Sequence, residues 1–250
     1  MNWQNFIGNE KTVVRLQNLL VEKRLPHALL FVGPKGIGKF LAATMIAAAI
    51  FYDNEEKYEA VMQHPDLHIL KPEGQTIKIE QVRQLENDIS LAPYEAEQRV
   101  IIIDQAESMT VQSANSLLKT LEEPIGNVLF MLIVSNRQML LDTILSRCMV
   151  VDFQPISREV LAQALGNQGI EHEEAAVIAR LANGSLAKAL EFLQENALEV
   201  RNMALECLEQ LCAADMEYVW KQSSVFGEME RTKLSQVLHD LNVLLRDILI

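Results

Sequence analysis

The stretch ALLFVGPKGIGKF occupies residues 28–40. Its apolar half, from Ala28 to Val32, predicts a buried strand. The glycine-rich turn that follows contains the phosphate-binding pattern G-x-x-x-x-G-K, and a long apolar helix begins after it. Glycines in such a turn let backbone N–H groups close around an anion, and the helix start adds the positive end of its dipole. We therefore predict a phosphate cradle formed by Gly33, Lys35, Gly36, Gly38 and Lys39.

Two positions beside this cradle depart from the pattern of nucleotide hydrolases. The residue after Lys39 normally carries the hydroxyl that binds Mg²⁺, and here it is Phe40. Asp104 ends the β-branched run at residues 99–103, at the strand end where such an acid helps to hold Mg²⁺. The next residue is Gln105, whose amide can orient a water molecule but cannot take its proton. The pattern thus predicts a degenerate nucleotide site, with Asp104 as a binding residue and without competent Mg²⁺-dependent hydrolysis.

Apolar runs and helical spacings alternate along the first 153 residues. Five strands are expected, at residues 28–32, 67–70, 99–104, 128–134 and 149–153. Strands that alternate with helices predict an α/β domain with a mainly parallel sheet. We expect Asn9 to cap the first helix. After Pro155 only helical spacings remain, so we predict an α/β domain over 1–153, a small helical domain over 154–196 and the start of a further helical domain over 197–250. Because the last residues are strongly apolar, we expect that domain to continue beyond residue 250.

Composition narrows the class of protein. The 250 residues carry a net charge of −12, which argues against a strong stand-alone nucleic-acid binder. Three cysteines form no paired framework, the N-terminus has no signal-peptide pattern, and the longest apolar run is too short for a membrane span. These features predict a cytoplasmic protein. His64 and His68 lie four residues apart, but Pro65 disfavours a helix there. We therefore prefer a loop histidine and a strand histidine to a metal site, and predict no metal.

Several further blocks point to one family. They are Phe6–Gly8 with residues 27–31, residues 77–83, residues 100–109, LLKTLEEP at 117–124 and ILSRC at 144–148. In this order and spacing the chain resembles the clamp-loader branch of the AAA+ ATPases. The resemblance implies an AAA+ P-loop domain with a five-stranded sheet, a three-helix lid and a helical collar through which subunits form an open ring. The collar would be truncated at residue 250.

The resemblance also marks where this chain departs from ATP-using loaders. Those subunits carry an arginine in the lid, where this chain has Gly184-Ser185-Leu186 followed by Ala187. Many relatives hold zinc with four cysteines before the His-Pro-Asp segment, and no cysteine lies there in this chain. The resemblance therefore implies no zinc and no required cofactor, with weak binding of ATP or phosphate at most.

Arg147 lies in the Ser-Arg-Cys block that the family uses across a subunit interface. The resemblance implies that Arg147 acts in trans on the ATP site of a neighbouring γ/τ subunit. Expected partners are δ and γ/τ, with the sliding clamp and primed DNA reached through the complex, and no membrane. The chain would be a non-hydrolysing subunit of the bacterial DNA polymerase III clamp loader. The alternatives are an autonomous γ-like ATPase and, more weakly, a P-loop kinase.

Overall fold

The computed structural model describes residue 3, residues 6–90, 92–124, 126–193 and 203–209, and scattered positions between 226 and 245. The chain divides into two compact units, Met1–Ala187 and Lys188–Ile250. Most of the predicted collar, 197–250, lies outside the described residues, as do residues 194–196 of the predicted lid. Residues 203–209 are helical. The division at residues 153 and 196 stays a prediction.

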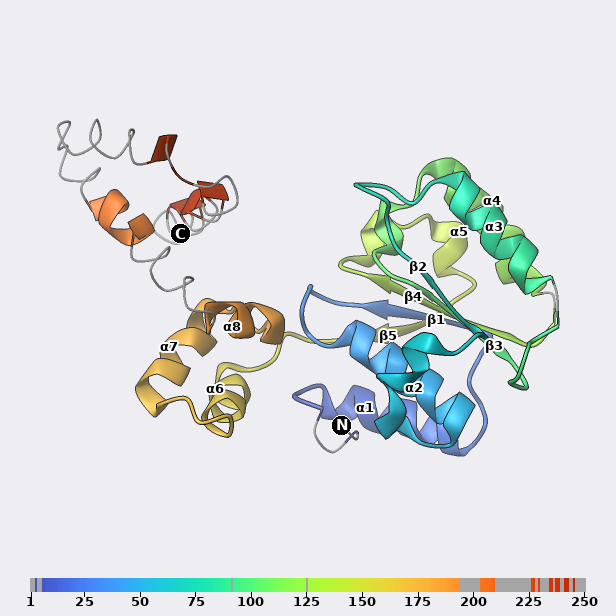
Figure 1. Cartoon of the computed structure of the whole chain (residues 1–250), viewed down its shortest axis with the longest axis horizontal. Helices are drawn as coiled ribbons and strands as arrows, with labels where there is room; N and C mark the ends of the chain where they lie inside the picture. Colours follow the sequence, from blue (N-terminus) through green and yellow to red (C-terminus); the bar gives the residue numbers. More distant parts are fainter. Residues whose placement is uncertain are drawn as a thin grey trace. The chain divides into compact units, whose positions relative to one another are not determined.

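A single five-stranded parallel sheet forms the centre of the first unit, as the apolar runs predict (Figure 1). Its strand order is β2-β3-β4-β1-β5, and every neighbouring pair is parallel. The strands are β1 (Ala28–Val32), β2 (Leu67–Leu70), β3 (Arg99–Ile103), β4 (Val128–Val134) and β5 (Met149–Asp152). Strands β3 and β5 each end one residue earlier than the sequence predicts.

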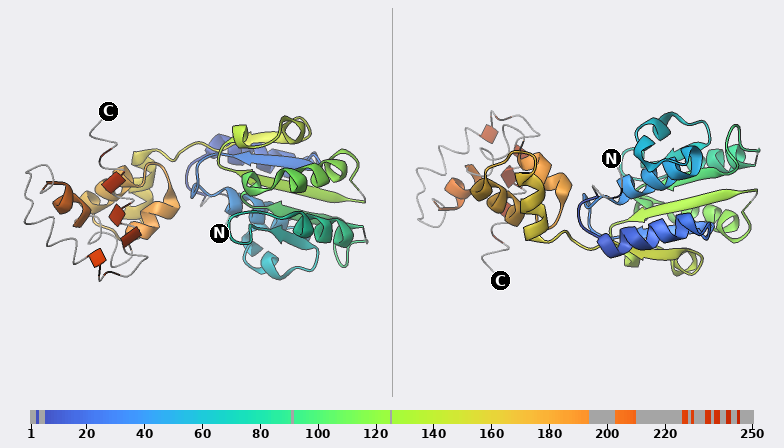
Figure 2. Two further views of the ribbon diagram at one scale, coloured as in Figure 1. Left: turned by 90° about the horizontal axis from the view of Figure 1, so that it is seen from above. Right: turned by 90° about the horizontal axis from the view of Figure 1, so that it is seen from below.

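Helices cover both faces of the sheet (Figure 2). Helices α1 (Glu10–Val21) and α2 (Lys39–Tyr52) pack on one face, and α3 (Ile79–Ile89), α4 (Val111–Glu122) and α5 (Asp142–Leu145) pack on the other. Successive residues of a strand point to opposite faces, so Phe31 joins the first core cluster and Leu30 the second. Because both faces are covered, β1, β3 and β4 are buried along their whole length, which explains their continuous apolar runs.

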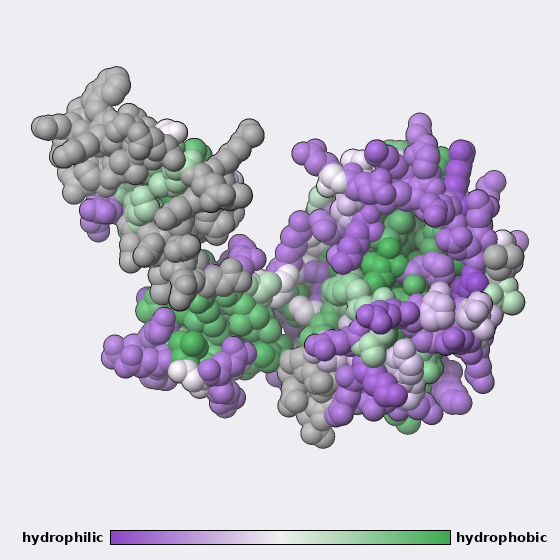
Figure 3. All heavy atoms as spheres, viewed as in Figure 1, coloured by the Kyte–Doolittle hydropathy of each residue, from purple (hydrophilic) through white to green (hydrophobic). Residues whose placement is uncertain are grey.

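The outer helices are amphipathic. Helix α3 buries Val82, Leu85 and Ile89 at helical spacing. Hydrophilic side chains gather over α3 and α4 on the face shown in Figure 3. Between the described strands and helices lie the short 3₁₀ helices η2 (Glu55–Lys57), η3 (Ala60–Gln63), η4 (Ala106–Ser108) and η5 (Arg137–Met139).

Within residues 154–193, three helices follow the sheet, as predicted: α6 (Arg158–Gly166), α7 (His172–Leu181) and α8 (Leu186–Phe192). Ser157 caps α6, since its side chain accepts a hydrogen bond from the backbone N–H of Val160. Helix α6 buries Leu161 and Leu165, and α7 buries Ile178.

The expected cap at Asn9 is wrong. Asn9 directly precedes α1, but its backbone is left-handed, with φ 60°, and its side chain makes no capping hydrogen bond. Instead Asn9 Nδ2 donates to the carbonyl of Gln154 over 3.0 Å, and Asn9 Oδ1 accepts from Gln154 N–H over 2.6 Å. The Asn9 side chain therefore joins the start of α1 to the segment after β5. Residues near Asn9 in the sequence give no sign of this contact.

Candidate functional site

The phosphate cradle connects β1 to α2 at the edge of the sheet where the strands end. Gly36 and Gly38 have left-handed backbones, with φ 78° and 96°. A Cβ on Gly38 would lie 2.7 Å from the Phe6 ring, and a Cβ on Gly33 would lie 2.3 Å from the carbonyl oxygen of Phe153. Glycine is therefore required here for both conformation and space.

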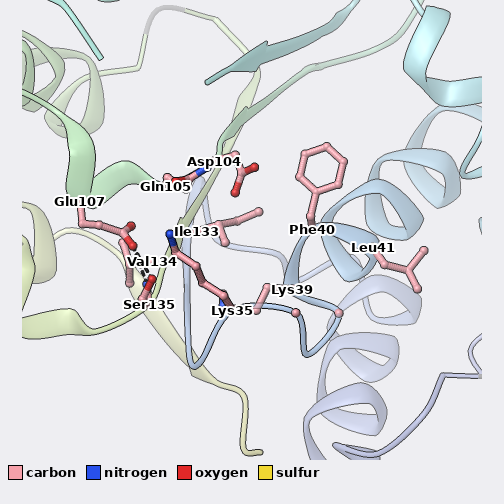
Figure 4. A pocket seen from close by; sticks show the side chains of 12 residues that line it. Lys35, Lys39, Phe40, Leu41, Asp104, Gln105, Glu107, Ile133, Val134 and Ser135 are labelled. Atoms are coloured by element: carbon pink, nitrogen blue, oxygen red, sulfur yellow. Dashed lines mark hydrogen bonds between the residues drawn. The ribbon is translucent and has the colours of Figure 1, made fainter. Parts of the chain in front are cut away.

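Lys35, Gly36, Gly38 and Lys39 of the predicted cradle line a cavity of about 270 Å³, and Gly33 does not. Figure 4 shows Phe40 and Leu41 on the helix side of this cavity, with Glu107 and Ser135 opposite. The lining consists of Lys35, Gly36, Gly38, Lys39, Phe40, Leu41, Asp104, Gln105, Glu107, Ile133, Val134 and Ser135. The structure thus brings Asp104 to the cradle, as the sequence predicts, because β3 and β1 both end at this edge of the parallel sheet.

Lys39 turns its ammonium group back onto the cradle. Its Nζ donates hydrogen bonds to the carbonyl oxygens of Gly33 and Pro34. The residue is only 6% exposed, and this burial lowers the pKa of Lys39 from 10.5 to about 8, although the carboxylates of Glu107 and Asp104 oppose the shift. An ammonium group has three N–H donors, so one remains for a ligand. Lys39 is therefore charged at neutral pH but already committed to its own loop.

Phe40 occupies the place of the magnesium hydroxyl with an aromatic ring. The ring lines the cavity, and Lys71 Nζ lies 4.6 Å from the ring centroid, within the range of a cation–π contact. A phenyl ring offers no oxygen to a cation such as Mg²⁺, which prefers oxygen ligands. Phe40 therefore supplies no ligand for Mg²⁺, and the helix side of the cavity is apolar at Phe40 and Leu41.

Glu107 is a cavity residue that the sequence reasoning missed. It lies on η4, three residues after Asp104, and its Oε1 accepts hydrogen bonds from Ser135 N over 3.1 Å and from Ser135 Oγ. Its Oε2 is buried and has no hydrogen-bond partner among the described residues. Glu107 raises the pKa of Lys39 more than Asp104 does. An acid just past a strand end is the only local signal, and the pairing with Ser135 comes from the next strand of the sheet.

Ser185 and the first turn of α8 contact the cradle at Gly36. The carbonyl of Gly36 accepts a hydrogen bond from Ala187 N–H over 3.1 Å, and a Cβ on Gly36 would lie 2.2 Å from Ser185 Oγ. Part of the cradle backbone is therefore already bonded to the protein itself.

Arg147 lies at the opposite edge of the sheet, just before β5 begins. Strand β1 is five residues long, so this edge is roughly 16 Å from the cradle. Arg147 lines an open cavity of about 490 Å³ together with His27, Leu121, Glu122 and Ser146. Its side chain is 31% exposed, and its NH2 pairs with Glu122 Oε1. Arg147 therefore cannot serve the cradle of its own chain, but it can be reached from outside.

Arg99 makes a second arginine–carboxylate pair near the same edge, and this pair is buried. Arg99 Nε lies 3.6 Å from Asp66 Oδ1, with side chains 8% and 0% exposed. The Asp66 carboxylate accepts three backbone N–H bonds, from Tyr94, Glu95 and Ala96. Burial would raise the pKa of Asp66, but these hydrogen bonds outweigh burial and hold it below its usual 3.8. The pair therefore fixes the loop that leads into β3.

His64, His68 and Cys148 lie in surroundings that suit packing rather than metal binding or catalysis. His64 ends η3 and stacks on Phe51 with ring centroids 3.9 Å apart, while His68 lies on β2. Within the part of the chain that the structure describes, no group of three or more His, Cys, Asp or Glu side chains has the arrangement of a metal site. Cys148 is buried, and burial raises the pKa of its thiol to about 11, which suits packing rather than nucleophilic chemistry. None of the described helices has the length and apolarity to cross a bilayer.

Comparisons with known proteins agree on the family. A family profile described as "DNA polymerase III, delta subunit" matches residues 8–157. DNA polymerase III subunit delta' of Bacillus subtilis is 32% identical over the whole of this chain and 80% of its own length. Subunit tau of the same organism is 26% identical over 96% of this chain, and tau of Escherichia coli is 34% identical over 74% of it. The matches cover 44% and 31% of those two proteins.

Solved structures agree on the fold. The RuvB Holliday junction branch migration motor of Thermotoga maritima superposes with a TM-score of 0.55 at 16% identity, covering 95% of this chain and 70% of that one. That likeness shows the fold. The family profile and the 32% identical relative show that the chain belongs to the clamp-loader family of DNA polymerase III subunits, in its delta-prime (δ′) branch.

Proposed function

We propose that this chain is a non-hydrolysing, cytoplasmic clamp-loader subunit that completes the ATP site of a neighbour with Arg147. Its partners would be δ and an ATP-using γ/τ subunit, and through them the sliding clamp and primed DNA. The observation that carries the proposal is the position of Arg147, which is accessible and roughly 16 Å from the cradle of its own chain. A guanidinium there is too far from the cradle of its own chain to contact a phosphate in it, but another molecule can reach it.

The chemistry of the cradle supports the non-hydrolysing part of the proposal. The magnesium hydroxyl is replaced by Phe40, the residue after Asp104 is Gln105, and Lys39 is bonded to its own loop. Each lost charge-assisted contact costs about 1.5–3 kcal/mol, which is roughly 10- to 100-fold in affinity. The loss of a group that activates water lowers the rate further. We infer that the cradle holds ATP or phosphate weakly, without turnover, and that the chain requires neither a cofactor nor zinc.

The contribution proposed for Arg147 follows from the charge of the transferring phosphate. Negative charge spreads over the γ-phosphate oxygens in the transition state. In the best-studied NTPases, an arginine supplied by another protein stabilises this charge and raises the hydrolysis rate by about 10³- to 10⁵-fold. The backbone N–H of Arg147 donates to the carbonyl of Ile144 over 3.1 Å, and β5 begins two residues later, so the backbone beneath this side chain is held by its own domain.

Two measurements test the proposal. The purified chain is incubated with Mg-ATP alone, and we expect no turnover above that of a Lys39→Ala variant. It is then mixed with the cognate tau, δ and clamp on primed DNA, where we expect Arg147→Ala to remove hydrolysis at one site. Turnover by the isolated chain would instead favour an autonomous ATPase. An unchanged rate with Arg147→Ala in the complex would refute the arginine role.

A further inference from the structure

The Arg147 side chain is engaged by its own chain at every nitrogen that reaches the surface. NH2 pairs with Glu122 Oε1, while NH1 donates to Thr143 O over 2.7 Å and to Ser146 Oγ over 3.1 Å. Nε is buried and has no hydrogen-bond partner among the described residues. A guanidinium has five N–H donors, so this arrangement leaves only one on NH2 for another molecule. In this conformation Arg147 cannot offer the two-pronged fork that binds phosphate oxygens.

Glu122 stands at a position that helix physics disfavours for an acid. It is the last residue of α4, where the helix dipole is negative, and Glu123 follows it. Leu117 and Leu121 anchor the same turn in the core, so the backbone under Glu122 is held in place. The contact with Arg147 offsets this unfavourable location, and it is the only ion pair recorded for Glu122 in the described part of the chain.

We propose that Glu122 is a latch that holds Arg147 on its own chain until the ATP of a neighbour competes for the guanidinium. This inference rests on the proposed function and names the positioning residue for it. The Glu122 carboxylate and the γ-phosphate both offer anionic oxygens to NH2, so they compete for its N–H groups. Release of the latch frees both N–H groups of NH2 for phosphate oxygens, while NH1 stays bonded to Thr143 and Ser146.

The exposure of the pair sets the strength of the latch. The Arg147 and Glu122 side chains are 31% and 49% exposed, and surface pairs of this kind favour the closed form by about 1.4- to 5-fold, or about 0.2–1 kcal/mol. Only the open form accepts the phosphate, so loss of the latch raises the competent fraction by roughly two- to sixfold. A contact of this strength lowers the fraction of Arg147 that is free to bind phosphate, but it leaves part of the population free.

The test compares Glu122→Gln with Glu123→Gln in the full chain, reconstituted with the cognate tau, δ, clamp and primed DNA. Glu123 is the matched control because it is the adjacent exposed glutamate. We expect Glu122→Gln to lower the KM for Mg-ATP at the completed site by roughly two- to sixfold, with an unchanged kcat. Glu123→Gln should behave like wild type, and both variants should unfold within about 4 °C of it.

A double variant separates the latch from the trans role. If Glu122 acts through Arg147, then Glu122→Gln has no effect on KM in an Arg147→Ala background. A shift of equal size there would overturn the latch. So would a fall in kcat at unchanged KM, because Glu122 would then orient Arg147 instead of restraining it. If Arg147→Ala lowers hydrolysis but Glu122→Gln matches Glu123→Gln, the latch fails and the proposed function stands; if Arg147→Ala itself has no effect, the proposed function fails.

Discussion

Arg99 and Arg147 both pair with a carboxylate near the edge of the sheet where the strands begin, yet the two pairs differ in burial. Asp66 and Arg99 are 0% and 8% exposed, whereas Glu122 and Arg147 are 49% and 31% exposed. A buried pair that loses one partner leaves an uncompensated charge, while an exposed pair exchanges its partner for water. The Asp66–Arg99 pair therefore contributes to stability, whereas Arg147 can exchange Glu122 for another partner.

The removal of Arg147 gives the largest expected effect and tests the exchangeable pair directly. Arg147→Ala should lower hydrolysis at the site it completes by roughly 10³-fold or more, because the charge on the γ-phosphate loses its partner. Single-turnover hydrolysis in the reconstituted complex measures this. Arg24→Ala is the control, since Arg24 is also a surface arginine paired with a glutamate, Glu22. Equal effects of the two variants would contradict any special role for Arg147.

The removal of the Asp66 charge should break the buried pair. Asp66→Asn is expected to lower the free energy of unfolding by about 3–5 kcal/mol, because Arg99 then stays buried without its counter-ion. Urea denaturation at pH 7 measures the loss. The pKa of Asp66 is held below 3.8, so its stabilising contribution is present above pH 3.8 and is lost as the pH falls through its folded pKa. The difference between wild type and Asp66→Asn should therefore shrink in acid; a difference that persists at low pH would contradict this cause.

Lys39 extends the comparison to a third cation, which is buried and forms no ion pair with the residues that the structure describes. Burial lowers its pKa to about 8, so the ammonium loses its proton as the pH rises through 8. Sulfate keeps its charge over this range, and its affinity for the cradle should fall about tenfold between pH 7 and pH 9. Calorimetric titration measures this, and Lys39→Met should abolish the dependence. A flat profile in the wild type would show that Lys39 does not contact the anion.

The smallest expected effect belongs to the exposed pair and concerns stability. Glu122→Gln should change the free energy of unfolding by less than about 1 kcal/mol, because water replaces the lost contact. The same urea series that measures Asp66→Asn gives this value. If the two variants cost the same, burial is not what distinguishes the pairs, and the comparison between them fails.

Much of the sheet and of the cradle can be predicted from local sequence patterns. The β1, β2 and β4 bounds match the apolar runs, and Asp104 lies at the cradle because parallel strands end together. Local pattern could not reveal the pairing of Glu107 with Ser135, which joins residues 28 positions apart, or of Glu122 with Arg147, 25 apart. It also misplaced the role of Asn9, whose partner Gln154 is 145 positions away.

The sequence alone determines the alternation of strands and helices, the glycine-rich turn and the apolar residue Phe40 beside it. Each of these features depends on residues a few positions apart in the chain. Tertiary packing determines which charged side chains are bonded within the chain and which can be reached by other molecules. Lys39 and Arg147 are both cations in recognisable motifs, yet Lys39 is 6% exposed and the side chain of Arg147 is 31% exposed. The physical reason is that desolvation and the identity of a charge's partner depend on distances through space, which strand order and helix packing set.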